Sequence, residues 1–259
     1  MAHDMQSDQV LSTEQLVRVL RLLRGVDSVE LKLSVAAADR RSAVAVLEMD
    51  PLDAQIRQVT FFDTPDLALD RQGVVMRVRR VQGKPGDSVV KLRPVVPDDI
   101  PAELRRSADF GVELDAMPGG YTCSGAMKTS RDDAVIKDVM EGRLPAHKAF
   151  SKAQRALFAQ YAPSGVELDD LSALGPITVV KLRLRPEAFG RRLVAELWHY
   201  PDGSRILELS TRCDPTEAFQ VAAEARGVLA DRGIDLTAPQ QMKTRTALEH
   251  FAALLRDGR

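Results

Sequence analysis

Charged side chains recur at every second position in several short stretches of this chain, and this pattern limits the folds open to it. In residues 28–34, Glu30 and Lys32 alternate with apolar residues. A two-residue period is typical of a half-buried strand, because successive side chains of a strand point to opposite faces. The same alternation returns in residues 74–81, 88–94, 111–116, 176–186, 192–200 and 204–212. The sequence therefore predicts a sheet with one charged and one apolar face.

Helical patterns lie between and after these predicted strands. They occupy residues 12–24, about 130–141, 151–161, 215–233 and about 239–256. Apolar residues in these segments recur at the spacing of an amphipathic helix. Residues 82–87, 95–109 and 118–125 have the composition of turns or loops, and Pro-Asp-Gly at 201–203 predicts a hairpin. Residues 36–50 have no pattern that assigns a structure.

The charged faces of the predicted strands have two interpretations. They could lie in water, as the polar face of a sheet usually does. However, runs such as Lys181, Arg183 and Arg185 concentrate like charges that a bound anion would relieve. The amphipathic helices also need an apolar surface to cover. If they cover the apolar face of a closed sheet, the charged face becomes the inside of a barrel that binds a polyanion.

Composition excludes several other classes of protein. With 28% charged residues and a formal net charge of −1, the 259-residue chain does not predict bulk binding of nucleic acid polymers. No apolar run is long enough to cross a bilayer, and the first residues, MAHDMQSDQV, lack the features of a secretory signal. We therefore expect a cytoplasmic protein without a membrane partner. Cys123 and Cys213 lack metal-ligand spacing, and no Walker or dinucleotide motif is present.

Several motifs of the chain resemble those of the CYTH domains, or triphosphate tunnel metalloenzymes. This family includes class IV adenylate cyclases, thiamine triphosphatases and inorganic tripolyphosphatases. The motifs are SVELK at 28–32, FFDTPDLALDRQGVVMRVRR at 61–80, VVKLRP at 89–94, KLRLR at 181–185, Glu196, and ELS at 208–210. The resemblance extends over residues 28–245.

The resemblance implies an α+β fold, in which helices pack outside a closed antiparallel β-barrel of about eight strands. We expect a single domain over residues 1–259. It would consist of an N-terminal helical segment (1–26), the tunnel barrel with its covering helices (28–245) and a C-terminal helix (239–259).

The resemblance also implies a site inside the barrel. By comparison with the family motifs, Lys32 and Glu30 would be catalytic. The side chains that would bind the phosphates are Arg77, Arg79, Lys91, Arg93, Lys181, Arg183 and Arg185. Mg²⁺ or Mn²⁺ would be held by Glu30, Glu113, Glu196 and Glu208.

This chain departs from the family pattern at two positions. Ser28 and Ser210 stand where the family has glutamates. Because sites for hard cations gain affinity with the number of carboxylates, these changes should weaken at least one metal site. We interpret Asp115 as a residue of the barrel rim. Trp198 and Tyr200 would pack at the barrel mouth, with contact to a base as the alternative.

Three functions are compatible with these motifs. The leading hypothesis is a metal-dependent hydrolase of inorganic tripolyphosphate or a small organic triphosphate. The second is a polyphosphate- or nucleotide-binding protein with reduced or lost catalysis, and the third is an adenylate cyclase of the class IV type. The expected partner is a small triphosphate or polyphosphate, while both a monomer and a homodimer remain open.

Overall fold

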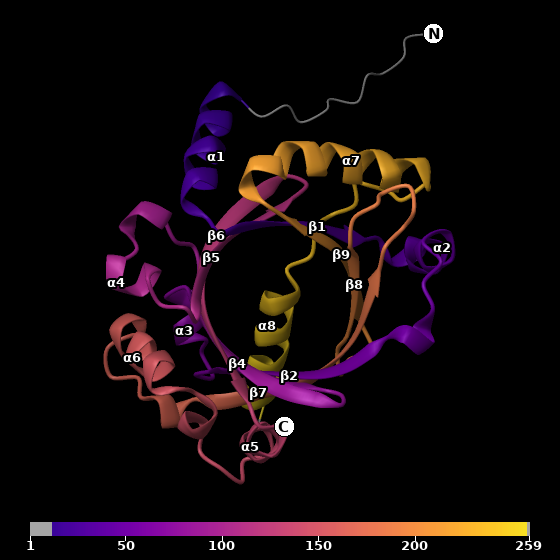
Figure 1. Ribbon diagram of the computed structural model, residues 1–259. Coiled ribbons are helices and arrows are strands. Elements are labelled where there is room, and N and C mark those ends of the chain that lie inside the picture. Colours follow the sequence, from indigo (N-terminus) through magenta and orange to yellow (C-terminus); the bar gives the residue numbers. More distant parts are fainter. Residues whose placement is uncertain (1–11, 258–259) are drawn as a thin grey trace.

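A closed β-barrel forms the centre of the molecule (Figure 1). The computed structural model describes residues 12–257, and nine strands of this part of the chain form the barrel. They are β1 (Ser28–Val35), β2 (Gln55–Asp63), β3 (Val74–Val81), β4 (Lys84–Leu92), β5 (Phe110–Met117), β6 (Gly120–Arg131), β7 (Ser172–Leu184), β8 (Leu193–His199) and β9 (Arg205–Cys213). Around the barrel they follow the order β1-β5-β6-β4-β3-β2-β7-β8-β9, and β9 pairs back to β1. The predicted barrel is therefore confirmed.

Three details of the predicted barrel were wrong. β1 and β5 pair in parallel, so the barrel is mixed and not wholly antiparallel. Residues 118–125, expected to be a loop, contain only a tight turn at Gly119 (φ 84°), after which β6 pairs with β5 and β4. A second tight turn at Gly83 (φ 68°) lets β4 begin at Lys84, inside the predicted turn at 82–87. Glycine suits both turns because it adopts positive φ without steric cost.

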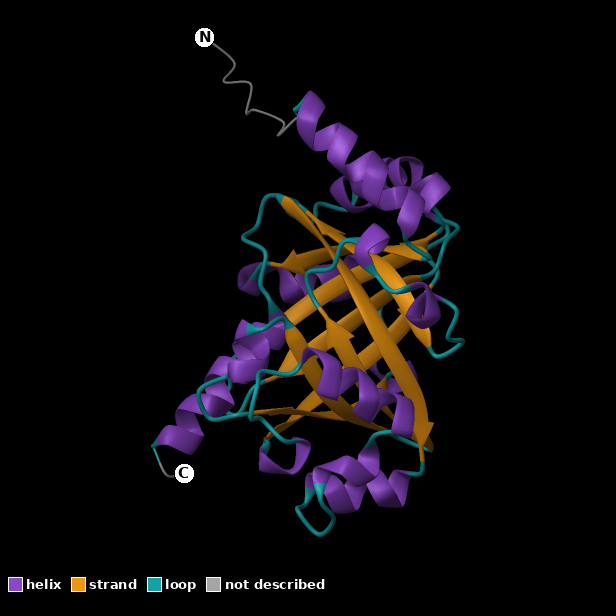
Figure 2. Ribbon diagram, turned by 90° about the vertical axis from the view of Figure 1, so that its left-hand side faces the viewer, coloured by secondary structure: helices purple, strands orange, loops and turns teal. Residues whose placement is uncertain are grey.

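Helices surround the barrel (Figures 1 and 2). They are α1 (Thr13–Gly25), α2 (Arg40–Val46), α3 (Ala68–Arg71), α4 (Ala102–Arg105), α5 (Asp133–Met140), α6 (Lys152–Tyr161), α7 (Ala218–Asp231) and α8 (Lys243–Arg256). The five predicted helices are present, although α8 begins four residues later than expected. The unassigned residues 36–50 contain α2, and the expected loop 95–109 contains α4. None of the described helices has the length and apolar composition needed to span a bilayer.

The outer face of the barrel forms the main hydrophobic core with these helices. Val29 of β1 and Leu114 of β5 are fully buried there, in the same cluster as Ile136 of α5 and Leu157 of α6. Gln154 of α6 donates hydrogen bonds to backbone carbonyls of both β4 and β6, at 2.9 and 3.1 Å. Because helices cover the apolar face, the alternating charged side chains point into the barrel.

Helix α8 closes one end of the lumen (Figures 1 and 2). Its Ala247 and Leu248 are buried against Val59, Val179 and Trp198. The strand register places these three residues on the luminal face. Val179 pairs with Trp198, two positions from the pair formed by Lys181 and Glu196, and Val59 pairs with Arg79. This end of the lumen is therefore apolar and filled, and the charged groups lie beyond it.

Candidate functional site

The barrel brings most of the predicted site residues to one luminal face. Alternation along each strand and pairing between neighbouring strands place them on the same face. The luminal residues are Glu30, Lys32, Arg77, Arg79, Lys91, Glu113, Lys181, Arg183, Glu196 and Glu208. Arg93 follows the end of β4 and reaches Asp115. Arg183 is exposed, and Arg185 lies beyond the end of β7 and is also exposed.

Three carboxylates meet where β1 lies beside β5. Oxygen atoms of Glu30, Glu113 and Asp115 lie within 4.8 Å of one another. The parallel register aligns Asp115 with Glu30 and Glu113 with Ser28. The interpretation of Asp115 as a rim residue was wrong, because its side chain is fully buried. Asp115 therefore supplies the third carboxylate of a cluster in which the family glutamate at position 28 is missing.

Basic side chains surround Asp115. The Lys32 Nζ atom lies 2.8 Å from Asp115 Oδ1, and the Lys91 Nζ and Arg93 Nη2 atoms lie 3.5 and 3.6 Å from its Oδ2. Lys32 Nζ is also 3.2 Å from Glu30 Oε2. Burial alone would raise the pKa of Asp115, but Lys91, Lys32 and then Arg93 lower it to about 2. Asp115 is therefore ionised at neutral pH.

The pKa values of the other groups in this cluster move in different directions. Burial alone would lower the pKa of Lys32, but the carboxylates of Asp115 and Glu30 raise it. Burial alone would raise the pKa of Glu30, but Lys32 lowers it. For Glu113, burial and the neighbouring Glu30 carboxylate raise the pKa. Carboxylates that crowd in this way would be relieved by a bound cation, and their hard oxygen atoms suit Mg²⁺ or Mn²⁺.

A second cluster in the lumen is strongly basic. Arg79 Nε donates to Asp87 Oδ2 at 3.0 Å, and Lys128 Nζ lies 3.7 Å from the same oxygen. Burial, and after it the Arg79 charge, lowers the pKa of Arg57 to about 10. The Nε atom of Arg77 is buried and has no hydrogen-bond partner among the described residues. Burial, and after it the charges of Arg79, Arg77 and Arg57, lower the pKa of Lys128, so positive charge is concentrated around the carboxylate that Arg79 and Lys128 contact.

A third cluster lies where α8 enters the barrel. Lys181 Nζ is 2.9 Å from Glu196 Oε1. Lys243, the first residue of α8, places its Nζ 2.7 Å from Glu196 Oε2 and 2.6 Å from Glu208 Oε1. Burial alone would raise the pKa of Glu196, but Lys243 and then Lys181 hold it well below its usual range. Two carboxylates and two ammonium groups therefore balance each other.

Sequence reasoning missed several members of these clusters. Arg57 precedes Val59 and Phe61 in a strand-like alternation, so it had a signal, whereas Lys128 follows small and weakly polar residues that show no clear alternation. Asp87 was assigned to a turn. Lys243 had no signal in the sequence, because only the fold brings the start of α8 beside β8 and β9.

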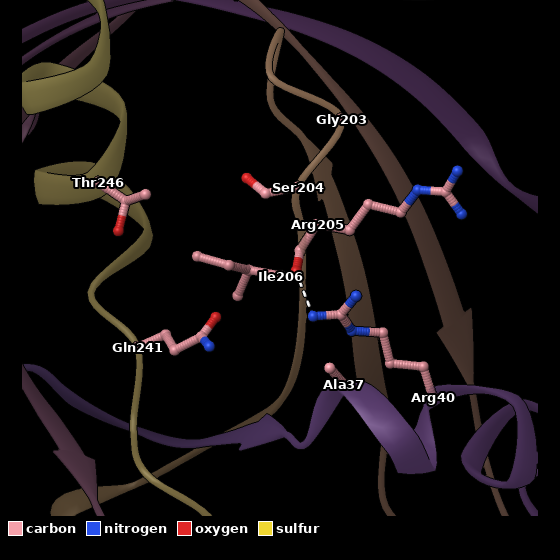
Figure 3. A pocket seen from close by; sticks show the side chains of 8 residues that line it. All are labelled: Ala37, Arg40, Gly203, Ser204, Arg205, Ile206, Gln241 and Thr246. Atoms are coloured by element: carbon pink, nitrogen blue, oxygen red, sulfur yellow. Dashed lines mark hydrogen bonds between the residues drawn. The ribbon is translucent and has the colours of Figure 1, made fainter.

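An open cavity of about 730 Å³ marks the place where the chain enters α8 (Figure 3). It is lined by residues of α2, of the start of β9 and of α8 with its preceding segment, among them Arg40, Ser204, Gln241 and Thr246. Arg40 donates a hydrogen bond to the backbone carbonyl of Arg205. None of the predicted site residues is among the described residues that line this cavity. It adjoins the lumen at Ile206, which lies on the same face of β9 as Glu208.

The fold is similar to that of solved proteins. No family model and no curated protein sequence matches this chain. A candidate adenylate cyclase from Bacillus halodurans has a TM-score of 0.58 and 16% identity, over 84% of this chain and 96% of that one. A candidate adenylyl cyclase from Hippeastrum, described as having a dominant triphosphatase activity, has a TM-score of 0.59 and 17% identity, over 89% of this chain and 95% of that one. At this identity the similarity concerns the fold. The chain therefore has the tunnel fold of the CYTH domains that its sequence resembles.

Proposed function

We propose that this chain is a metal-dependent hydrolase that binds inorganic tripolyphosphate or a small organic triphosphate inside the barrel. The observation that carries the proposal is the basic cluster of the lumen, where Arg79 and Lys128 contact the carboxylate of Asp87 and the charges of Arg57 and Arg77 act on the same group of cations. Such a group of cations is stabilised when an anion of several charges lies between them. The structural similarity to a protein with a described triphosphatase activity supports the same function.

The basic residues would bind the phosphate groups directly. Arginine suits this task because its planar guanidinium can donate two parallel hydrogen bonds to phosphate oxygens. The buried Nε–H group of Arg77 has no partner within residues 12–257 and is available for such a bond. Lys91 and Arg93 flank the acidic cluster and would hold a phosphate next to it. Arg183, and less directly Arg185, would act at the exposed mouth.

The acidic cluster would hold one divalent cation through Glu30, Glu113 and Asp115. Mg²⁺ or Mn²⁺ bound there would neutralise phosphate charge and activate the attacking water. Lys32 keeps Glu30 and Asp115 in place and stays protonated, so it would stabilise negative charge and would not act as a base. Glu30 stays ionised, as an oxygen ligand must. Transfer of a phosphoryl group to water needs mainly this charge neutralisation and positioning.

The direct test measures phosphate release from tripolyphosphate, ATP and thiamine triphosphate with Mg²⁺ and with Mn²⁺. We expect release from at least one of them, abolished by EDTA and reduced at least a hundredfold in Glu30→Gln. If the wild type releases no more phosphate than Glu30→Gln from any of the three substrates, the hydrolase is refuted.

Two other functions have distinct outcomes in the same assay. Two structural neighbours are named as cyclases, so the products formed from ATP should also be identified. Cyclic AMP together with pyrophosphate would indicate a cyclase. Tight tripolyphosphate binding without turnover would indicate a binding protein. In that case, Ser28→Glu combined with Ser210→Glu should raise hydrolysis, since both restore carboxylates of the family pattern.

A further inference from the structure

An ammonium group of the chain lies between two glutamates that were predicted to hold a metal ion. Lys243 Nζ forms ion pairs with Glu196 and Glu208 at 2.7 and 2.6 Å. It therefore occupies the position between the two carboxylates where a bridging cation would be bound. The two glutamates, as they are arranged here, do not fit a divalent cation without displacement of Lys243.

The charges of this cluster are already balanced. Glu196 also pairs with Lys181, so two negative groups face two positive groups. A divalent cation gains affinity from an excess of carboxylates, and this cluster offers none. By contrast, Glu30 and Glu113 converge with Asp115 as three carboxylates within 4.8 Å. The two acidic regions of the lumen thus differ in their capacity for metal.

The fold fixes Lys243 in this position. Its backbone carbonyl accepts a hydrogen bond from Tyr200 Oη at 2.9 Å, and its Nζ lies 5.1 Å from the centroid of the Trp198 ring. The segment before it is attached to β1, because Ser34 N donates to Gln240 Oε1 at 2.8 Å and Gln241 N donates to Ser34 Oγ at 3.0 Å.

The residues after Lys243 continue this attachment. Ala247 and Leu248 are buried in the apolar end of the lumen. Figure 3 shows Gln241 and Thr246 on either side of the point where the chain turns into α8. These contacts hold the backbone of Lys243 beside β8 and β9, so its ammonium group stays within reach of the two carboxylates as long as α8 is in place.

We propose that Lys243 replaces a second divalent cation in this protein. The chain binds one metal ion, at Glu30, Glu113 and Asp115, and α8 supplies a covalently attached ammonium group to Glu196 and Glu208. This inference rests on the proposed function for the presence of the metal at Glu30, Glu113 and Asp115. It makes Glu196 and Glu208 the partners of Lys243 and not metal ligands. Ser210 lies two residues after Glu208 on β9, where the family has a glutamate, and its lack of a carboxylate is consistent with the loss of a second metal site.

The test is a titration of metal-free, full-length protein with Mn²⁺ and without any phosphate, followed by electron paramagnetic resonance and calorimetry. We expect one ion per chain for the wild type. Glu113→Gln should weaken its binding by about tenfold or more, since it removes a charged ligand. Glu196→Gln and Glu208→Gln should each change its affinity less than about twofold, since neither side chain contacts the ion. Two ions per chain, or weakened binding in Glu196→Gln or Glu208→Gln, would overturn the proposal.

A lysine variant gives a second, independent result. Lys243→Met removes the ammonium group and should let a second Mn²⁺ bind, whereas Lys152→Met, an exposed lysine of α6, should retain one ion. A folded Lys243→Met protein that still binds one ion would count against the proposal. If this variant does not fold, the two glutamine variants decide the question alone. The titration contains no phosphate, so its outcome is independent of the hydrolysis assay. One bound ion without turnover in that assay would refute only the hydrolase, and turnover with two bound ions would refute only this inference.

Discussion

Removal of the Arg77 charge should weaken tripolyphosphate binding without lowering the stability of the ligand-free protein. Arg77 and Arg79 lie two residues apart on one face of β3, so their Cα atoms are about 6.6 Å apart at roughly 3.3 Å per residue. Two unit charges at that distance repel each other by about 2.5 kcal/mol at an effective dielectric constant near 20. Asp87 neutralises part of the Arg79 charge. We therefore expect Arg77→Met to leave the free energy of unfolding of the ligand-free protein unchanged or to raise it by about 1–2 kcal/mol.

The same substitution should reduce the stabilisation by tripolyphosphate. At a hundredfold excess over Kd, a ligand stabilises the wild type by about 2.7 kcal/mol. For a chain of this length that corresponds to a rise in Tm of roughly 5–11 °C. A charge-assisted hydrogen bond contributes about 1.5–3 kcal/mol, so its loss weakens binding about 10- to 100-fold. At the same tripolyphosphate concentration the variant should then gain only about 0.4–1.4 kcal/mol.

The measurement is thermal unfolding with and without tripolyphosphate at moderate salt. Arg41→Met, which removes an exposed arginine of α2, is the matched control and should keep the full shift. A variant that keeps the wild-type shift would remove Arg77 from the site. A ligand-free variant destabilised by more than about 2 kcal/mol would show that Arg77 acts in the structure, since that loss is typical of a disrupted buried network.

Three further predictions concern the acidic cluster and the barrel wall. The pKa of Asp115 is lowered on folding, so its ionised carboxylate contributes about 2 kcal/mol to the free energy of unfolding above pH 4, and this contribution is lost as the pH falls toward 2. Urea unfolding of metal-free protein should therefore show Asp115→Asn less stable than the wild type at pH 7, with the difference shrinking in acid. A constant difference would contradict this. Phosphate release by Glu113→Gln should need about tenfold more Mn²⁺ for half-maximal rate than wild type, and an unchanged requirement would exclude Glu113 as a ligand. Gly125→Ala should lower the free energy of unfolding by about 1–3 kcal/mol in chemical denaturation, because its Cβ would lie 2.5 Å from the Phe110 ring. Gly120→Ala on the same strand is the control and should be neutral, since its Cβ would meet no atom within 4 Å.

The strands with strict alternation were predictable because one face of each is covered by helices and the other carries charge. β1 has this pattern over its whole length, and β3 has it over residues 76–79. β6 does not, since its luminal residues Thr122, Ser124 and Ala126 are small or weakly polar and its start is rich in glycine. The composition of a loop and that of a strand lining a crowded lumen are too similar here to be separated without the pairing partners.

The position of Asp115 was mistaken for a reason of geometry. In the sequence it lies near the end of a strand, three residues before Pro118, which suggests the rim. In the barrel, β5 is staggered so that Asp115 is aligned with Glu30, deep in β1. Stagger between strands is set by closure of the whole barrel, and no local pattern reports it. The same holds for Lys243, whose contacts depend on where α8 enters.

Barrel closure through β1 also determines the order in which the protein can be assembled during synthesis. β1 pairs with β5 on one side and with β9 on the other. Strands β2 to β6 can pair once residue 131 has emerged from the ribosome, but the second edge of β1 has no partner until residues 205–213 have followed. A nascent chain that ends before β9 would present two unpaired edges, at β1 and β8. Unpaired edges template association with other chains, so this late stage of translation is when the protein most needs protection from aggregation.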